Sequence, residues 1–147
     1  MKSQSTLFAC FIASLALGLM GLKTEQAAVE GSEALYIGYQ ELYVVAEQGK
    51  TITKHGVEAC QHWSLATTDL AGVLEAMEHV SGTVWYSRCY QLGCYYSFTV
   101  ANAAGVRYQM DVYAGSYVIL SNDDETLHFI DKEPNRLFLE ACSCCEE

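Results

Sequence analysis

A period of two between Val106 and Tyr113 constrains the fold of this chain more than any other pattern in its sequence. One face of the implied strand is apolar and the other mostly polar: Val106, Tyr108, Met110 and Val112 against Arg107, Gln109, Asp111 and Tyr113. Such alternation is typical of an antiparallel strand with one face on a core and one toward water. Composition predicts further strands at Glu33–Glu47, Val84–Tyr90, Tyr95–Ala101, Tyr117–Leu120, Leu127–Ile130 and Leu137–Ala141.

A helical period interrupts these strands between Thr68 and Val80. Apolar residues recur there at steps of three and four: Leu70, Val73, Leu74, Met77 and Val80. Thr67 or Thr68 can cap the start, and Ser81-Gly82 is predicted to end the helix. The polar stretch Glu47–Gly56 is predicted as a loop or hairpin tip.

These elements predict an α+β fold: an antiparallel sheet of about five to seven strands with one main helix packed on it, tied by disulfides. The chain of 147 residues suits one domain, and its apolar share of 51% is enough for a packed core.

The first residues have the features of a secretory signal peptide. Lys2 precedes an uncharged apolar run of sixteen residues, Leu7–Leu22. A spanning helix needs about 20 residues, so the run fits a cleaved leader better than a retained anchor. We expect residues 1–28 to be a signal peptide, cleaved near Gly21 or Ala27-Ala28, and residues 29–147 to be a single exported globular domain.

Removal of the leader sharpens the acidic surplus. Residues 29–147 hold 6 basic and 17 acidic side chains, which gives a net charge of −11 compared with −10 for the whole chain. Because this charge repels phosphate groups, we expect no nucleic-acid partner and no membrane association after signal cleavage.

Seven cysteines cannot all pair within one chain, but Cys10 lies in the predicted leader. An exported domain favours structural disulfides for the six that remain: Cys60, Cys89, Cys94, Cys142, Cys144 and Cys145. Their pairing cannot be chosen from the sequence. Two alternatives stay open: a metal site that joins the tail cysteines to Cys60 and His62, and a thiol-redox site at Cys142 and Cys145.

The residues that catalysis would need are present but not arranged in a motif. His55, His62, His79 and His128 are scattered, and the chain lacks G-x-S-x-G, H-E-x-x-H and a Gly-rich phosphate loop. Asp123-Asp124-Glu125 lacks EF-hand spacing and is best explained as a solvated turn. We therefore expect no enzyme activity, no cofactor and no metal.

Ten tyrosines are the more informative side chains, because several flank the segment from Cys89 to Cys94. Aromatic surface beside acidic loops is typical of a protein-binding patch. The candidate partner-binding residues are Tyr86, Tyr90, Tyr95, Ser116, Tyr117, Asp123, Asp124 and Glu125.

From Ala59 to Cys145 the chain resembles, by order and spacing, a group of small exported bacterial proteins. The matching pieces are Cys60, the predicted helix Thr68–Val80, Tyr86–Cys94, Gly105–Tyr108, Ala114–Ser116 and Cys142–Cys145. The chain departs from the pattern at Ser116 and in having Cys89 and Cys144, and a bond between these two additional cysteines is one hypothesis. Some proteins of the group resemble immunity proteins for type VI secretion effectors, and the resemblance implies that role here.

The leading hypothesis is therefore a periplasmic immunity or inhibitor protein. It would bind a cognate toxin, of the cell-wall hydrolase or lipase type, and block its active cleft. One alternative is a periplasmic lysozyme inhibitor that inserts the Ala114–Tyr117 loop into a carbohydrate cleft. The others are a thiol-redox or metal-binding protein that uses the C-terminal cysteines, and a structural envelope protein. Homo-oligomerisation is left open.

Overall fold

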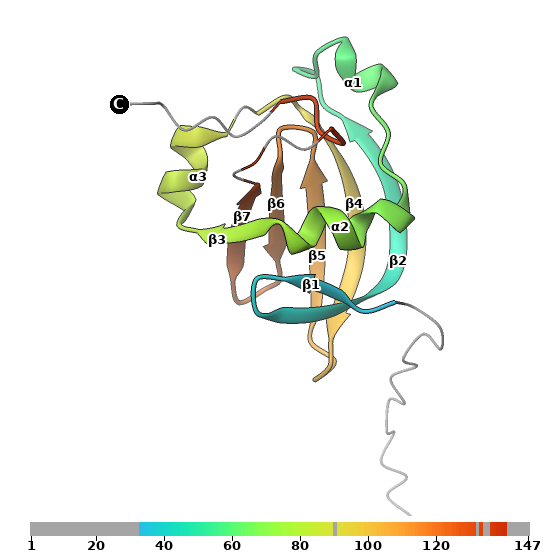
Figure 1. The fold of residues 1–147 in the computed structure, drawn as a ribbon, viewed down its shortest axis with the longest axis vertical. Helices are drawn as coiled ribbons and strands as arrows, with labels where there is room; N and C mark the ends of the chain where they lie inside the picture. Colours follow the sequence, from blue (N-terminus) through green and yellow to red (C-terminus); the bar gives the residue numbers. More distant parts are fainter. Residues whose placement is uncertain (1–32, 90, 132, 134–135, 141–147) are drawn as a thin grey trace, which may run out of the picture.

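A computed structural model of the chain describes residues 33–89, 91–131, 133 and 136–140. Within these residues, seven strands form one antiparallel sheet in the order β1-β2-β4-β5-β6-β7-β3 (Figure 1). The strands are β1 (Leu35–Ile37), β2 (Gln40–Ile52), β3 (Met77–Val80), β4 (Cys94–Asn102), β5 (Arg107–Tyr113), β6 (Tyr117–Ser121) and β7 (Thr126–Asp131). The helical segments are α1 (Ala59–His62), a 3-10 turn η1 (Thr67–Asp69), α2 (Leu70–Glu75) and α3 (Gly82–Arg88).

The sheet curls toward a barrel, and its two ends come round to the same side (Figure 1). Helix α2 continues almost directly into β3, and this span crosses in front of the sheet beside the β1–β2 hairpin. The core fills the space enclosed in this way, with fully buried side chains from both layers, among them Leu42, Leu74, Phe98 and Met110. The predicted alternation is confirmed for Tyr108, Met110 and Val112, which are buried in β5, but wrong for Val106, which precedes the strand and is 43% exposed.

The α+β class, the antiparallel sheet and a disulfide are confirmed, but the helical part is smaller than predicted and is divided into short segments. Helix α2 ends at Glu75, and Met77–Val80 forms β3, which pairs with β7. The apolar stripe is nevertheless buried along most of its length: Leu70, Val73, Leu74 and Met77 lie in the core. Pairing with the edge of β7 satisfies backbone groups there, and this tertiary gain overrides the helical period.

The predicted strand Val84–Tyr90 is also wrong, because Gly82–Arg88 forms helix α3. Ser81 is its N-cap, and the Ser81 hydroxyl oxygen accepts a hydrogen bond from the Val84 N–H at 3.3 Å. The sequence feature interpreted as the end of one helix is therefore the start of the next. Trp85 on α3 packs against a second, smaller apolar cluster with Cys89, Tyr117 and Ile130.

The predicted loop at Glu47–Gly56 is only partly correct, because β2 continues to Ile52. Its register with β4 shifts between Val44 and Ala46 and again between Glu47 and Gly49. Bulges of this kind bend a strand strongly, which lets the same strand pair with both β1 and β4 as the sheet curls.

The predicted strand at Leu137–Ala141 is wrong over its described residues, which form turns that cover the end of the sheet. The Leu139 N–H donates to the Ala114 carbonyl at 2.9 Å, and the Ser116 hydroxyl donates to the Glu140 carbonyl at 2.5 Å. The Phe138 side chain, which belongs to this segment, is buried. These contacts hold residues 137–140 across the β5–β6 turn.

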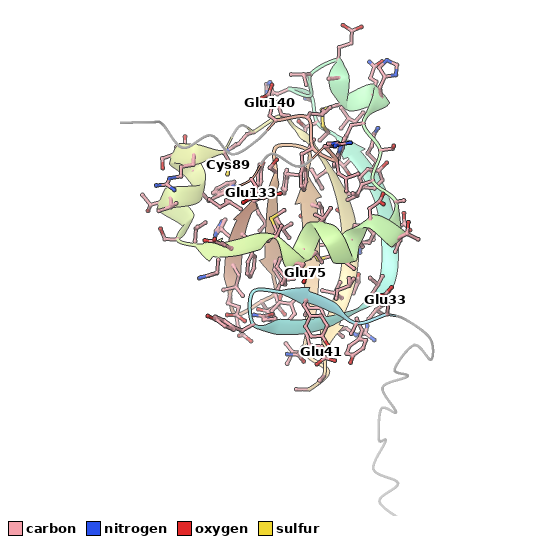
Figure 2. All side chains as sticks on the ribbon, in the orientation of Figure 1. Glu33, Glu41, Glu75, Cys89, Glu133 and Glu140 are labelled. Carbon is pink, nitrogen blue, oxygen red and sulfur yellow. A yellow bond between two sulfur atoms is a disulfide. The ribbon has the colours of Figure 1, made fainter. Side chains whose placement is uncertain are left out.

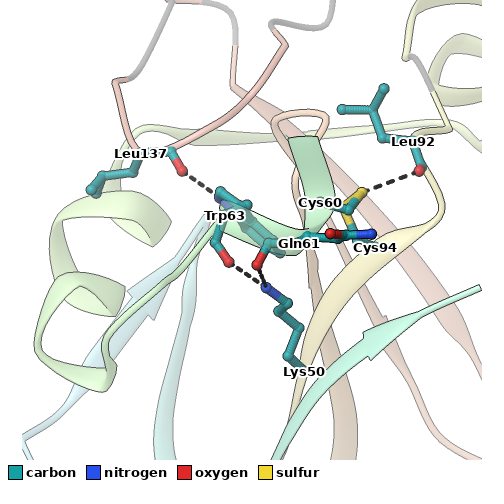
Figure 3. Close-up of a disulfide and its surroundings, with 7 residues drawn as sticks. All are labelled: Lys50, Cys60, Gln61, Trp63, Leu92, Cys94 and Leu137. Atoms are coloured by element: carbon teal, nitrogen blue, oxygen red, sulfur yellow. Dashed lines mark hydrogen bonds between the residues drawn. A yellow bond between two sulfur atoms is a disulfide. The ribbon is translucent and has the colours of Figure 1, made fainter. Parts of the chain in front are cut away.

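A disulfide between Cys60 and Cys94 ties α1 to the start of β4 (Figure 3). Beside it, the Lys50 ammonium donates to the Gln61 and Trp63 carbonyls at 3.2 and 2.6 Å, and the Trp63 indole N–H donates to the Leu137 carbonyl at 2.7 Å. The Cys60 sulfur lies 3.4 Å from the Leu92 carbonyl oxygen, which is a contact only, since a bonded sulfur carries no proton. The predicted disulfide framework is therefore confirmed at this pair.

Cys89 is also disulfide-bonded. The predictions that concern Cys142, Cys144 and Cys145, including the Cys89–Cys144 pairing and the redox site, fall outside the described residues. The predicted signal peptide falls outside them as well. Among the helices that the structure describes, none is both long and apolar enough to cross a membrane.

Candidate functional site

The predicted partner-binding residues do not form one surface. Tyr86 projects from α3 with 74% of its area exposed, and Tyr95 is half-buried on β4. Asp123, Asp124 and Glu125 are exposed in the β6–β7 turn, at the other end of the sheet from α3. Tyr90 lies outside the described residues.

Two of the predicted contact residues are buried. Ser116 is 0% and Tyr117 1% exposed. The Tyr117 ring stacks on Tyr113 at 4.4 Å between centroids and meets Trp85 edge-on at 5.6 Å, so α3 covers it. Burial raises the pKa of Tyr113 to about 12. These side chains stabilise the packing of α3, and a partner would reach them only if α3 or the Leu137–Glu140 segment moved.

The structure also bears on the alternative of a metal site that joins the tail cysteines to Cys60 and His62. Cys60 is bonded to Cys94, so its thiolate is not free to join His62 in a ligand set. Within the described ranges, no group of three or more His, Cys, Asp or Glu side chains could hold a metal ion. His79 and His128 lie on neighbouring strands but contact aromatic rings, Phe129 at 5.4 Å and Trp85 at 4.8 Å. Burial lowers the pKa of His128, and the charge of nearby His79 lowers it further.

A concave feature lies elsewhere, between the β1–β2 hairpin and β3. It is a groove of about 810 Å³ whose walls come from Tyr36–Gln40 on one side and Glu75–His79 on the other. Leu127 and Phe129 of β7 line it from the sheet. The groove therefore opens where the curled sheet fails to close, between its two end strands β1 and β3.

Negative charge and aromatic rings line this groove. Glu75, Glu78 and Glu125 contribute carboxylates, and none of the lining residues is Lys or Arg. Figure 2 shows Glu75 at the end of α2, facing the hairpin that carries Glu41. Tyr36 is 55% exposed, and Tyr39 is fully exposed at the hairpin tip. Such a lining combines aromatic surface with negative charge.

The hydrogen bonding of two groups in the groove, the Glu125 carboxylate and the Gln40 side-chain oxygen, is defined by the structure. The Tyr108 hydroxyl donates to a Glu125 carboxylate oxygen at 3.0 Å, which fixes the position of that carboxylate. Burial, helped by this hydrogen bond, raises the pKa of Tyr108, so the phenol stays a donor at neutral pH. The Gln40 side-chain oxygen is buried and accepts no hydrogen bond from the described part of the chain. An orphan acceptor of this kind costs free energy until a donor reaches it.

No known relative identifies this site. Neither a protein-family model, nor a curated protein, nor a solved structure matches the chain.

Sequence reasoning found only Glu125 among the groove residues. It missed Tyr36, Tyr39, Gln40, Glu75 and Glu78, because Glu33–Glu47 was interpreted as one strand and Thr68–Val80 as one helix. A signal for the hairpin exists in Gly38, which has a φ of +58° in the turn. Glycine inside an apparent strand indicates a turn or bulge, and two short strands on either side follow from it.

Proposed function

We propose that this protein is a periplasmic immunity or inhibitor protein that binds a toxic effector enzyme and blocks it, without catalysis of its own. The acidic, aromatic groove between β1 and β3 is the observation that supports this proposal most strongly. Interfaces are enriched in tyrosine, and complementary charge speeds the encounter of two proteins and excludes wrong partners. A cell-wall hydrolase or lipase with a basic cleft is the kind of toxin that such a groove suits.

The rigidity of the surroundings favours the same role. The pairing of β1 with β2 and of β3 with β7 holds the groove walls before any partner arrives. A surface that is ordered in advance loses less conformational entropy on binding, so more of the contact energy contributes to affinity. Tight binding is what an inhibitor of a toxin needs.

The lysozyme-inhibitor alternative has less support from the structure. Ala114, Gly115, Ser116 and Tyr117 are all buried, and Leu137–Glu140 covers the turn that they form. Insertion of this loop into a carbohydrate cleft would require that segment to leave.

Co-expression tests the proposal directly. The exported product of each neighbouring gene is produced in the periplasm of a host cell with and without this protein, and survival is measured. We expect one such product to be toxic alone, to be neutralised by the protein and to co-purify with it. If no neighbouring product is either toxic or bound, the proposal is wrong.

A further inference from the structure

The groove between the β1–β2 hairpin and β3 is acidic, because its lining includes three glutamates and neither lysine nor arginine. Glu78 already has an interaction partner, so Glu75 and Glu125 are the carboxylates considered for a ligand. Glu125 is already held by the Tyr108 hydroxyl, yet a carboxylate accepts several hydrogen bonds. A ligand for this groove must therefore bring donors and positive charge.

The aromatic lining narrows the chemistry of that ligand. Tyr36 and Tyr39 are exposed and offer ring faces to a cation, while Phe129 and Leu127 give an apolar surface behind them. A guanidinium group stacks on aromatic rings, is weakly hydrated and carries five donors in one plane. A lysine ammonium is more strongly hydrated and has three donors. The apolar surface would cover the aliphatic stem of the side chain.

We infer that this groove binds an arginine side chain presented by a loop of a protein partner. The guanidinium lies against Tyr36 or Tyr39 and pairs with the carboxylates of Glu75 and Glu125. This inference rests on the proposed function and specifies it, because arginine is the charged residue most often found at the energetic centre of interfaces.

A short peptide tests the site without knowledge of the partner. The probe is N-acetyl-Arg-Arg-amide, and its matched control has citrulline, which keeps the shape but has no charge, in place of both arginines. Binding is followed by amide chemical shifts of the isotope-labelled protein in low salt. We expect the arginine peptide to shift signals of Tyr36–Gln40 and Met77–His79, and to bind at least about ten-fold more tightly than the citrulline peptide.

Substitutions in the protein test whether the arginine peptide binds in the groove. Glu75→Gln combined with Glu125→Gln is expected to weaken binding of the arginine peptide by about ten-fold. Glu58→Gln removes an acid of α1 that does not line the groove, so less than about a two-fold change is expected. Unchanged thermal unfolding of each variant shows that the fold is intact.

Three outcomes would overturn the inference: equal affinity for the citrulline peptide, an equal loss in Glu58→Gln, or shifts that map away from the groove. The toxin assay separates this failure from failure of the proposed function. If the groove variants protect cells as well as the unaltered protein, the groove assignment is wrong and the proposed function stands. If no toxin is found although the arginine peptide binds in the groove, the proposed function is wrong instead.

Discussion

Asp131 is a buried carboxylate at the end of β7 with only 1% of its area exposed. One oxygen accepts a hydrogen bond from the Glu133 N–H at 2.9 Å, and the other is without a partner in the described residues. Burial raises the pKa of Asp131 above its ordinary value, partly offset by the Glu133 hydrogen bond. The folded state therefore retains a proton that the unfolded state has released, and stability falls as pH rises from about 4 through the raised pKa.

Replacement of this carboxylate should stabilise the protein at neutral pH. Asp131→Asn keeps an acceptor for the Glu133 N–H and removes the buried charge, so we expect the free energy of unfolding to rise by about 1 kcal/mol at pH 7. The gain should vanish near pH 3, where both states of the natural protein are protonated. Urea unfolding at the two pH values measures this, with the exposed Asp124→Asn as a control that should show no gain. A lower stability of Asp131→Asn at pH 7 would contradict the argument.

At the scale of single residues, the side chains that are buried in the core could be predicted better than those that are exposed at the surface. The alternation around Tyr108 and Met110 identified core residues correctly, because a period of two is local. The sequence does not distinguish Ser116 and Tyr117 from Tyr86. In the structure, α3 and the Leu137–Glu140 segment cover Ser116 and Tyr117, whereas Tyr86 is exposed. That difference comes from segments distant along the chain.

At the scale of elements, the span from Leu70 to Arg88 shows why the type of element was harder to predict. Met77 and Val80 fit a helical stripe and a strand equally well, since spacings of three and four overlap with alternation over so short a run. Met77–Val80 forms a strand because it pairs with the edge of β7. Ser81 could have been identified as an N-cap, because serine caps helix starts far more often than it ends helices.

The disulfide is the link between elements with the largest expected effect. Cys60 and Cys94 are 34 residues apart, and closure of a loop of this length in the unfolded chain contributes about 3–4 kcal/mol. The double variant Cys60→Ala and Cys94→Ala should lose about that amount, measured by urea unfolding. Substitution is preferable to reduction, because Cys89 is disulfide-bonded as well and a reductant would open both links. A loss below about 1 kcal/mol would mean that packing around Trp63 already holds α1 in place.

At the scale of the whole molecule, net charge is predicted to govern the rate of partner binding. The full chain carries −10, and the groove lining includes neither lysine nor arginine. Attraction to a basic toxin is long-range and screened by salt, whereas short contacts in the groove are screened less. Raising NaCl from about 0.05 to about 0.5 M should slow association with the toxin by about ten-fold and change dissociation by less than about two-fold. Stopped-flow mixing separates the two rates, and a salt effect confined to dissociation would contradict the prediction.

At this scale the fold class could be predicted from the sequence, but the position of the groove could not. The antiparallel sheet follows from alternation and turns, which are properties of neighbouring residues. The groove forms because β1 and β3, about forty residues apart, end on the same side of a curled sheet. Its walls combine Gln40, Glu75 and Glu125 from three regions of the chain, and no local pattern connects them.

The ends of the sheet also bear on the behaviour of the protein at high concentration. An exposed strand edge can recruit a second molecule, and long apolar edges are the usual starting points of aggregation. Here the end strands β1 and β3 have three and four residues, whereas β2 inside the sheet has thirteen. Glu78 sits in one of these short ends, and β1 follows directly after Glu33 and Ala34. Such ends give two copies little backbone to share and place like charges together, which favours molecules that stay dispersed at high concentration.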